Sequence, residues 1–112
     1  MKISKEFTFD SAHRLKWHKG KCQNFHGHTY KLIVTVEGKL NQDGIVMDFA
    51  DLKNEVKKKV LNILDHKNLN EIFENPTAEN IAIWIWEKLK ELNLTEIKLW
   101  ETPTSYVIYN GK

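Results

Sequence analysis

The sequence contains a single cysteine, Cys22, and no long apolar segment. One cysteine cannot form an internal disulfide, and it suits a reducing compartment such as the cytoplasm. No apolar run approaches the roughly 20 residues that a membrane-spanning helix needs, and the N-terminus lacks the apolar stretch of a secretion signal. We therefore expect a cytoplasmic protein without a membrane partner.

An excess of charge of one sign is also absent. The 17 Lys and Arg residues are nearly balanced by 15 Asp and Glu residues, which leaves a formal net charge of +2. The lysines are mixed with acidic residues along the chain, and no basic stripe carries interleaved aromatic residues. The composition therefore gives no reason to expect nucleic acid as a partner.

Apolar and aromatic residues are plentiful for the length of the chain. A hydrophobic fraction of 41% in 112 residues suits one domain, residues 1–112, with its own core. Four tryptophans and five phenylalanines are many for so small a monomer to bury, so some are expected at contacts between subunits. Ordinary partial exposure of these aromatics is the alternative, and composition does not decide between the two.

Period-two alternation predicts strands at both ends of the chain. Residues 2–9 and 25–39 read as half-buried strands, separated by a polar loop that contains Cys22. After two helical segments, residues 96–102 and 105–110 read as two further strands.

The middle of the chain has helical spacing. Asp48 is a plausible N-cap for a helix that runs to about Leu64, and Thr77 can cap a second one, which Pro76 prevents from extending backwards. The apolar residues predicted for the first helix are Phe49, Leu52, Val56, Val60, Ile63 and Leu64, and those for the second are Ile81, Ile85, Leu89 and Leu92. Trp84 and Trp86 widen the second apolar stripe, which favours a contact with another surface.

This order of elements, ββααββ, predicts an α+β fold. Strands paired in hairpins, with the helices grouped between them, indicate an antiparallel four-stranded sheet with two helices on one face.

The stretch from Cys22 to His28 carries the clearest functional signal. In a strand, His26 and His28 point to the same side of the sheet because successive side chains alternate. His13 follows another strand-like run. Three histidines with an open fourth position describe a catalytic Zn²⁺ centre. The alternative is a set of hydrogen-bonded imidazoles that holds no metal.

Two carboxylates stand out further along. Asp65 precedes His66 at the expected end of the first helix, where it could orient the imidazole and stabilise its protonated form. The alternative for His66 is a helix-end histidine favoured by the helix dipole. By alternation, Glu101 shares a face with Ile97 and Leu99, where a carboxylate needs a partner.

Six motifs occur in order along the chain. They are Phe-Asp-Ser-Ala-His-Arg-Leu (9–15), Cys-x-x-x-His-Gly-His (22–28), Val-Met-Asp-Phe (46–49), Leu-Asp-His-Lys-Asn-Leu-Asn (64–70), Asn-Pro-Thr-Ala-Glu-Asn (75–80) and Trp-Glu-Thr (100–102). Together they resemble the 6-pyruvoyl-tetrahydropterin synthase family, and within it the 6-carboxy-tetrahydropterin synthase branch. The resemblance implies the tunnelling fold (T-fold), in which several subunits join their sheets into a barrel. It also implies a homo-oligomer, a hexamer built from two trimers, with Cys22 and Glu101 of one active site supplied by different chains.

The resemblance also implies roles for individual residues. Matching positions are His13, His26 and His28 for the zinc ligands, Cys22 for a proton-abstracting base, Asp65 and His66 for a proton relay, and Glu101 for anchoring the pterin. A thiol has an ordinary pKa of about 8.5, which nearby positive charge lowers. A lone cysteine can instead be a small buried hydrophobe, but the polar loop around Cys22 argues against that.

The implied reaction converts 7,8-dihydroneopterin triphosphate into 6-carboxy-tetrahydropterin, with release of acetaldehyde and triphosphate, on a route to 7-deazapurines such as queuosine. The spacer Gln23-Asn24-Phe25 is shorter than is usual in members that make the pyruvoyl product, and Gln23 differs from the glutamate of a folate-linked branch. Elimination of triphosphate alone, as in 6-pyruvoyl-tetrahydropterin synthases, is the alternative reaction. A zinc-stabilised binding module without catalysis is the alternative outside enzymes.

Overall fold

Two long antiparallel strands form the centre of the sheet. The computed structural model describes residues 1–112, and in it β1 (Lys2–His13) pairs with β2 (His26–Glu37) over its whole length. Apolar residues alternate with polar ones along both strands, so that Phe9 and Tyr30 are buried against each other with ring centroids 4.9 Å apart. The alternation defines one core face and one outer face of the sheet.

Three further strands complete a five-stranded sheet in the order β3-β1-β2-β4-β5. β4 (Leu94–Thr102) pairs antiparallel with β2, and β5 (Ser105–Tyr109) pairs antiparallel with β4. The α+β class is confirmed, but the prediction of four strands, all antiparallel, is wrong by one strand. β3 (Lys67–Asn68) pairs parallel with β1.

The extra strand has a local cause that alternation could not reveal. His66 adopts a left-handed backbone conformation with φ of 57°, which turns the chain back alongside β1 as the first helix ends. Its N–H then donates to the carbonyl of Asp10 at 2.6 Å. A strand of two residues is too short to show a period of two in the sequence.

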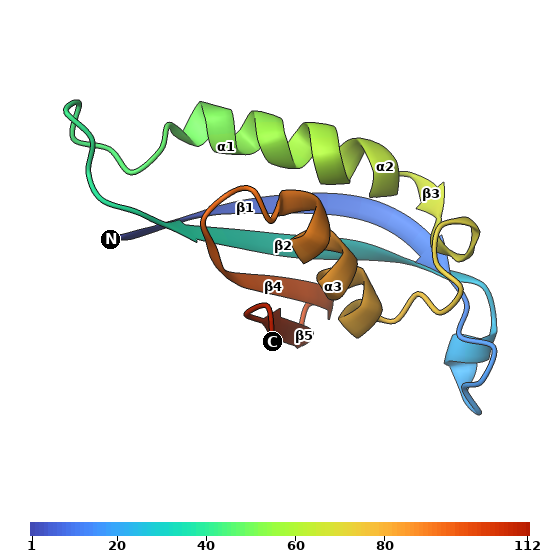
Figure 1. Ribbon diagram of the computed structural model, residues 1–112. Coiled ribbons are helices and arrows are strands. Elements are labelled where there is room, and N and C mark those ends of the chain that lie inside the picture. Colours follow the sequence, from blue (N-terminus) through green and yellow to red (C-terminus); the bar gives the residue numbers. More distant parts are fainter.

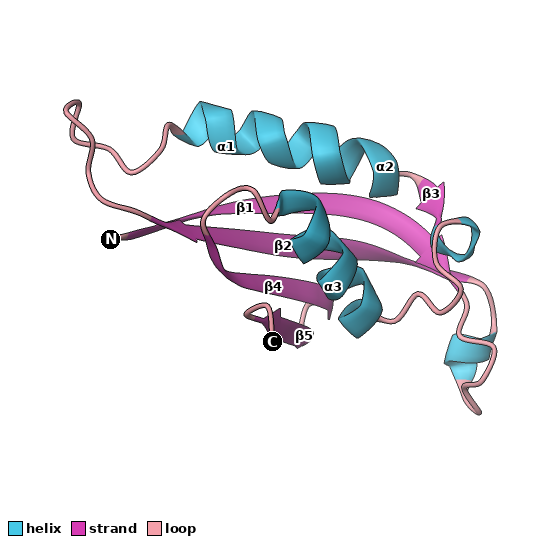
Figure 2. Cartoon of the chain, viewed as in Figure 1, coloured by secondary structure: helices cyan, strands magenta, loops and turns pink.

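The helices lie together on the core face (Figures 1 and 2). α1 (Phe49–Val56), a π-helical stretch (Lys57–Leu61) and α2 (Asn62–Leu64) form one continuous helix, and α3 (Ala78–Leu89) packs over β4 and β5. Short 3-10 turns occupy Lys21–Gln23 and Leu69–Glu71. No element of the chain covers the outer face of the sheet. No helix combines the length and the apolar character that crossing a bilayer requires.

The core contains most of the predicted apolar residues in a single cluster of 18. Phe49, the first residue of α1, is an exception, because its side chain is 52% exposed. Trp84 and Trp86 are half-buried against Phe73 and Tyr109, with ring centroids 5.6 and 5.5 Å apart, and their contact with another surface stays a prediction.

Both predicted N-caps are confirmed. Asp48 Oδ1 accepts from the N–H of Ala50 at 2.7 Å, and Thr77 Oγ1 accepts from the N–H of Asn80 at 3.1 Å. Each bond satisfies one backbone donor that the first turn of a helix leaves free.

Removing the Thr77 hydroxyl should therefore destabilise the protein. We expect Thr77→Ala to lower the free energy of unfolding by about 1 kcal/mol, measured by urea denaturation. Thr104→Ala is the matched control, because the Thr104 hydroxyl lies exposed in the β4–β5 turn and caps no helix. Equal stability of the Thr77 variant and the parent protein would contradict the role given to the cap.

Candidate metal centre

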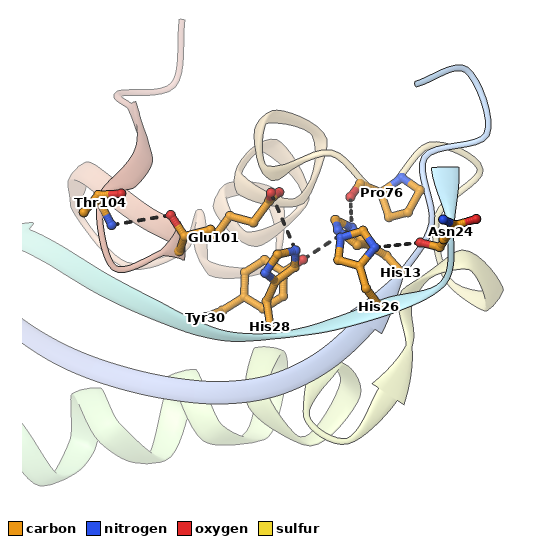
Figure 3. Close-up of polar contacts among 9 residues, drawn as sticks. His13, Asn24, His26, His28, Tyr30, Pro76, Glu101 and Thr104 are labelled. Atoms are coloured by element: carbon orange, nitrogen blue, oxygen red, sulfur yellow. Dashed lines mark hydrogen bonds and ion pairs between the residues drawn. The ribbon is translucent and has the colours of Figure 1, made fainter. Parts of the chain in front are cut away.

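The register of β1 and β2 brings three histidines together. His13 lies directly opposite His26, and His28 lies opposite Ser11, two positions further along. The pairing is continuous through Gly27, so both β2 histidines stay on the core face with Tyr30. Ring centroids are 4.7 Å apart for His13–His26, 5.1 Å for His13–His28 and 4.7 Å for His26–His28. One ligand nitrogen of each residue lies within 4.8 Å of the others, so the group can hold a metal ion (Figure 3).

Backbone carbonyls orient two of the three imidazoles. His13 Nδ1 is 2.8 Å from the carbonyl oxygen of Pro76, and His26 Nδ1 is 2.7 Å from that of Asn24. A carbonyl only accepts, so in both residues Nδ1 must carry the proton and donate it. The Nε2 lone pair is then free to bind a cation, and the second-shell carbonyl fixes the direction of the ring.

The nitrogens that face the group lack partners in the chain. Nε2 of His13 and Nε2 of His28 are both buried without a hydrogen bond. A buried polar atom without a partner costs free energy, and a native structure rarely leaves two of them side by side. A metal ion that takes nitrogen ligands would satisfy both.

The same burial keeps two of the imidazoles neutral. Burial lowers the pKa of His13, although its bond to Pro76 and the charge of Glu101 act in the opposite direction. Burial also lowers the pKa of His28, again against the effect of Glu101. Neutral imidazole is the form that binds metal, so the environment prepares these residues as ligands.

Glu101 lies beside the histidines in the same chain. It continues the core-facing row of Ile97 and Leu99 on β4, as alternation predicts, and its Oε1 is 3.7 Å from His28 Nε2. This distance is too long for a hydrogen bond, so the half-buried carboxylate keeps acceptor capacity for another group. Burial, together with Glu101, raises the pKa of the nearby Tyr30 phenol, which therefore stays protonated.

Cys22 is half-buried in the 3-10 turn at Lys21–Gln23. Its carbonyl accepts from the N–H of Leu15 at 2.7 Å, which closes the base of the loop between the two strands. The thiol is not among the atoms of the histidine group. Its predicted role as a base stays a prediction.

Asp65 and His66 belong to a second group. His66 Nδ1 is 3.0 Å from Asp65 Oδ1, and that carboxylate oxygen also accepts from the N–H of Asp10 at 2.9 Å. The Asp10 hydrogen bond, followed by His66, lowers the pKa of Asp65. Thr29 Oγ1 donates to Asp10 Oδ1 at 2.5 Å. The contacts of Asp10 and Thr29 were not predictable from the sequence, because single polar residues at exposed strand positions carry no distinguishing pattern.

Strand alternation separates the two groups within one chain. Asp10 and Thr29 are exposed on the outer face, whereas their neighbours Ser11 and His28 point to the core face. Asp10, Thr29 and His66 line an open pocket of about 540 Å³ that His28 also borders, yet the ligand atoms of Asp65 and His66 group with Asp10 and not with the three histidines. The Asp65–His66 pair therefore does not join the histidine cluster of its own chain.

Comparison with known proteins points to a single protein family. The sequence profile of the 6-pyruvoyl tetrahydropterin synthase family matches residues 2–112. A 6-carboxy-5,6,7,8-tetrahydropterin synthase from Haemophilus influenzae is 45% identical over 96% of this chain and 97% of its own length. A dihydroneopterin monophosphate aldolase from Pyrococcus furiosus is 44% identical over 84% of this chain and 83% of its own. The solved structure of Caenorhabditis elegans 6-pyruvoyl tetrahydropterin synthase superimposes with a TM-score of 0.89 at 34% identity, covering 100% of this chain and 96% of that one.

The lowered pKa values of His13 and His28 predict how stability depends on pH. In the unfolded chain these residues titrate near 6.5, so below that pH the unfolded state binds protons that the folded state does not. The free energy of unfolding of the metal-free protein should therefore fall as the pH drops from about 7 to about 5.5, a range in which carboxylates stay ionised.

Thermal unfolding in the presence of a chelator measures this effect, and the zinc-loaded protein provides the comparison. The loaded protein should be more stable at pH 7 and should lose that advantage in acid, because protons compete for the same nitrogens. An unfolding temperature that stays constant or rises between about pH 7 and 5.5 would show that the buried imidazoles do not favour the neutral form.

Proposed function

Because the chain belongs to the 6-pyruvoyl tetrahydropterin synthase family, we propose that it converts 7,8-dihydroneopterin triphosphate into 6-carboxy-5,6,7,8-tetrahydropterin. One water molecule is consumed, acetaldehyde and triphosphate are the other products, and the enzyme is a lyase. The observation that carries the proposal is the convergence of His13, His26 and His28 beside the carboxylate of Glu101. The H. influenzae relative supports the 6-carboxy branch.

We assign the three histidines to a bound Zn²⁺. A set of neutral imidazoles suits this ion, and three protein ligands leave a position open for substrate. When bound, zinc supplies a Lewis acid that lowers the pKa of a coordinated hydroxyl. His13 and His26 would keep their ligand nitrogens aimed inward through their bonds to Pro76 and Asn24.

Glu101 is the proposed anchor for the pterin ring. A 2-aminopyrimidinone edge offers two parallel N–H donors, which one carboxylate accepts in a bidentate manner. Placed 3.7 Å from His28, the Glu101 carboxylate would fix the ring at one end and leave its side chain near the histidines.

Cys22 is the proposed base, and Asp65–His66 the proposed proton relay. A thiolate can abstract a proton from the substrate side chain, and Lys19 and Lys21 precede Cys22 in the same loop. Asp65 holds the His66 imidazole through its Nδ1, which leaves Nε2 to give or accept a proton. A working thiol must stay reduced, which supports a cytoplasmic location.

The separation of the two groups supports an active site shared between subunits. The outer edge of β5 is unpaired, and β1 is paired on its outer side only at Ser11 and Ala12. Free edges of this kind can join the sheets of neighbouring copies. We propose a hexamer of two trimers, in which the Asp65–His66 pair of one copy faces the zinc, Cys22 and Glu101 of another. This division replaces the one expected from the sequence, which took Cys22 and Glu101 from different chains, because Glu101 lies 3.7 Å from His28 of its own chain.

The competing activities differ in their products. Only Gln23, Asn24 and Phe25 separate Cys22 from His26, which favours the 6-carboxy product over the 6-pyruvoyl one. The P. furiosus relative, at 44% identity, makes cleavage of dihydroneopterin monophosphate a second candidate.

Product identification distinguishes these possibilities. The purified zinc-loaded protein is incubated separately with dihydroneopterin triphosphate and with the monophosphate, and the pterins are identified by mass. We expect 6-carboxy-tetrahydropterin from the triphosphate. A 6-pyruvoyl product, turnover of the monophosphate alone, or no turnover with full zinc would reject the proposal. The last result would favour a zinc-stabilised binding module.

Two substitutions separate chemistry from binding. Cys22→Ala should reduce kcat by about 10²–10⁴-fold with little change in KM, because it removes a base but neither metal nor ring contacts. Glu101→Gln should raise KM as well, since an amide presents donors to the donor edge of the pterin, at a cost of about 1.5–3 kcal/mol.

Zinc content and circular dichroism are measured for both variants, so that a loss of metal or fold is not mistaken for a loss of chemistry. Turnover of Cys22→Ala at the parent rate with full zinc would remove the thiol from the mechanism. The base would then have to be sought at the Asp65–His66 pair.

Shared sites can be tested by complementation. Cys22→Ala and His66→Ala should each turn over far more slowly than the parent, whereas co-expressed, differently tagged copies should form mixed oligomers in which about a quarter of the sites carry both residues. Mixed oligomers purified through both tags should regain activity. If they stay as slow as the single variants, Cys22 and His66 do not meet across subunits.

A further inference from the structure

The near-neutral composition conceals one strongly basic loop. No acidic residue occurs between Asp10 and Glu37, and residues 14–21 alone contain four cations. They are Arg14, Lys16, Lys19 and Lys21. None of them takes part in any of the six ion pairs of the structure. Like charges gathered without partners repel one another, so the loop can gain free energy by binding an anion.

The loop is held in a defined position beside the histidine cluster. It begins directly after His13, and the backbone of Arg14 is fixed by two bonds to the side chain of Asn70, at 2.8 and 3.0 Å. Leu15 is buried, and its N–H donates to Cys22 at the other end of the loop. Figure 1 shows the loop in light blue at the end of β1 and β2, next to the segment that leads into α3.

Three loop side chains form one wall of a pocket of about 530 Å³. These are Arg14, Lys16 and Trp17; Phe73, Glu74, Asn75 and Asn80 form the remainder. Trp17 Nε1 donates to Asn75 Oδ1 at 2.8 Å, which ties the loop to the opposite wall. The next residue, Pro76, accepts from His13, so the pocket wall and the metal centre share a segment.

We propose that this pocket binds the polyphosphate chain of the substrate. Guanidinium and ammonium groups are the usual partners of phosphate oxygens, and Arg14 and Lys16 are both unpaired and face the same pocket. The identity of the ligand rests on the proposed function: a pterin whose ring reaches Glu101 and whose side chain reaches the histidines extends its phosphates away from the ring. A phosphate chain that leaves the histidine centre beside His13 would meet Arg14 first.

The negative charge of Glu74 in the same pocket provides a test of the proposal. It is the one acidic residue in the lining, and it forms no ion pair with Arg14 or Lys16. A carboxylate at that position repels a phosphate chain. Removing its charge should strengthen phosphate binding, whereas removing either cation should weaken it, and damage to the fold cannot produce both results.

The probe is inorganic tripolyphosphate, titrated into the zinc-loaded protein by calorimetry. Excess magnesium is present to limit zinc stripping, and zinc content is measured before and after. Arg14→Gln and Lys16→Gln should each weaken binding roughly tenfold, and Glu74→Gln should tighten it by about threefold. Lys39→Gln is the matched control, because Lys39 is an exposed loop lysine at the opposite end of the sheet, and it should bind like the parent.

Steady-state kinetics with the substrate provide a second test of the proposal. Arg14→Gln and Lys16→Gln should raise KM for dihydroneopterin triphosphate with kcat nearly unchanged, and the increase should shrink at high salt. Parent-like tripolyphosphate affinity in both variants would overturn the proposal even if the protein turns over the triphosphate. Conversely, if the protein makes no pterin product but the variants change tripolyphosphate affinity as expected, the pocket stands and the proposed reaction fails.

Discussion

The unbroken antiparallel register between β1 and β2 is the constraint on which the candidate centre depends. A slip of one residue would move His13 to the outer face, away from His26, and would move Phe9 out of the core at the same time. The core residues and the histidines therefore occupy the same alternate positions of each strand and point to the same face of the sheet. Packing of Phe9 against Tyr30 fixes the register, and the register in turn fixes the relative positions of the three imidazoles. Burial of His13 is the cost of this arrangement, and a metal ion is the group that would offset it.

The same alternation divides the functional groups of one chain. Every residue between two core-facing positions points outward, so Asp10 and Thr29 lie on the face opposite to the histidines. Asp10, which accepts from Thr29, donates its N–H to Asp65 and so holds the Asp65–His66 pair near that face. A single sheet cannot bring the two groups together without breaking its own pairing. The proposed association of copies through the free strand edges would avoid that conflict, because the outer group of one chain could then approach the inner group of another.

Sequence patterns predicted the features that depend on periodicity or on local chemistry. Alternation placed His26, His28 and Glu101 on the core face, and the caps at Asp48 and Thr77 were recognisable from their side chains alone. The features that were missed depend on contacts between distant segments. β3 exists because His66 turns the chain toward Asp10, more than fifty residues away in sequence. The carbonyls of Asn24 and Pro76 likewise have no signature, since every residue carries one.

Composition arguments are too general to place individual residues. The number of tryptophans suggested an intermolecular contact, and this stays a prediction: Trp84 and Trp86 are half-buried on neighbours within the chain, whereas Trp17 is 60% exposed. Net charge is too general in the same way, because a total near zero does not show how the charged residues are distributed along the chain. The cations of residues 14–21 are concentrated on a loop whose two ends are fixed by β1 and β2, the strands that carry the three histidines. The repulsion between these cations makes the loop an unfavourable choice for a purely structural connection. The same charge is favourable for holding an anion beside the histidines.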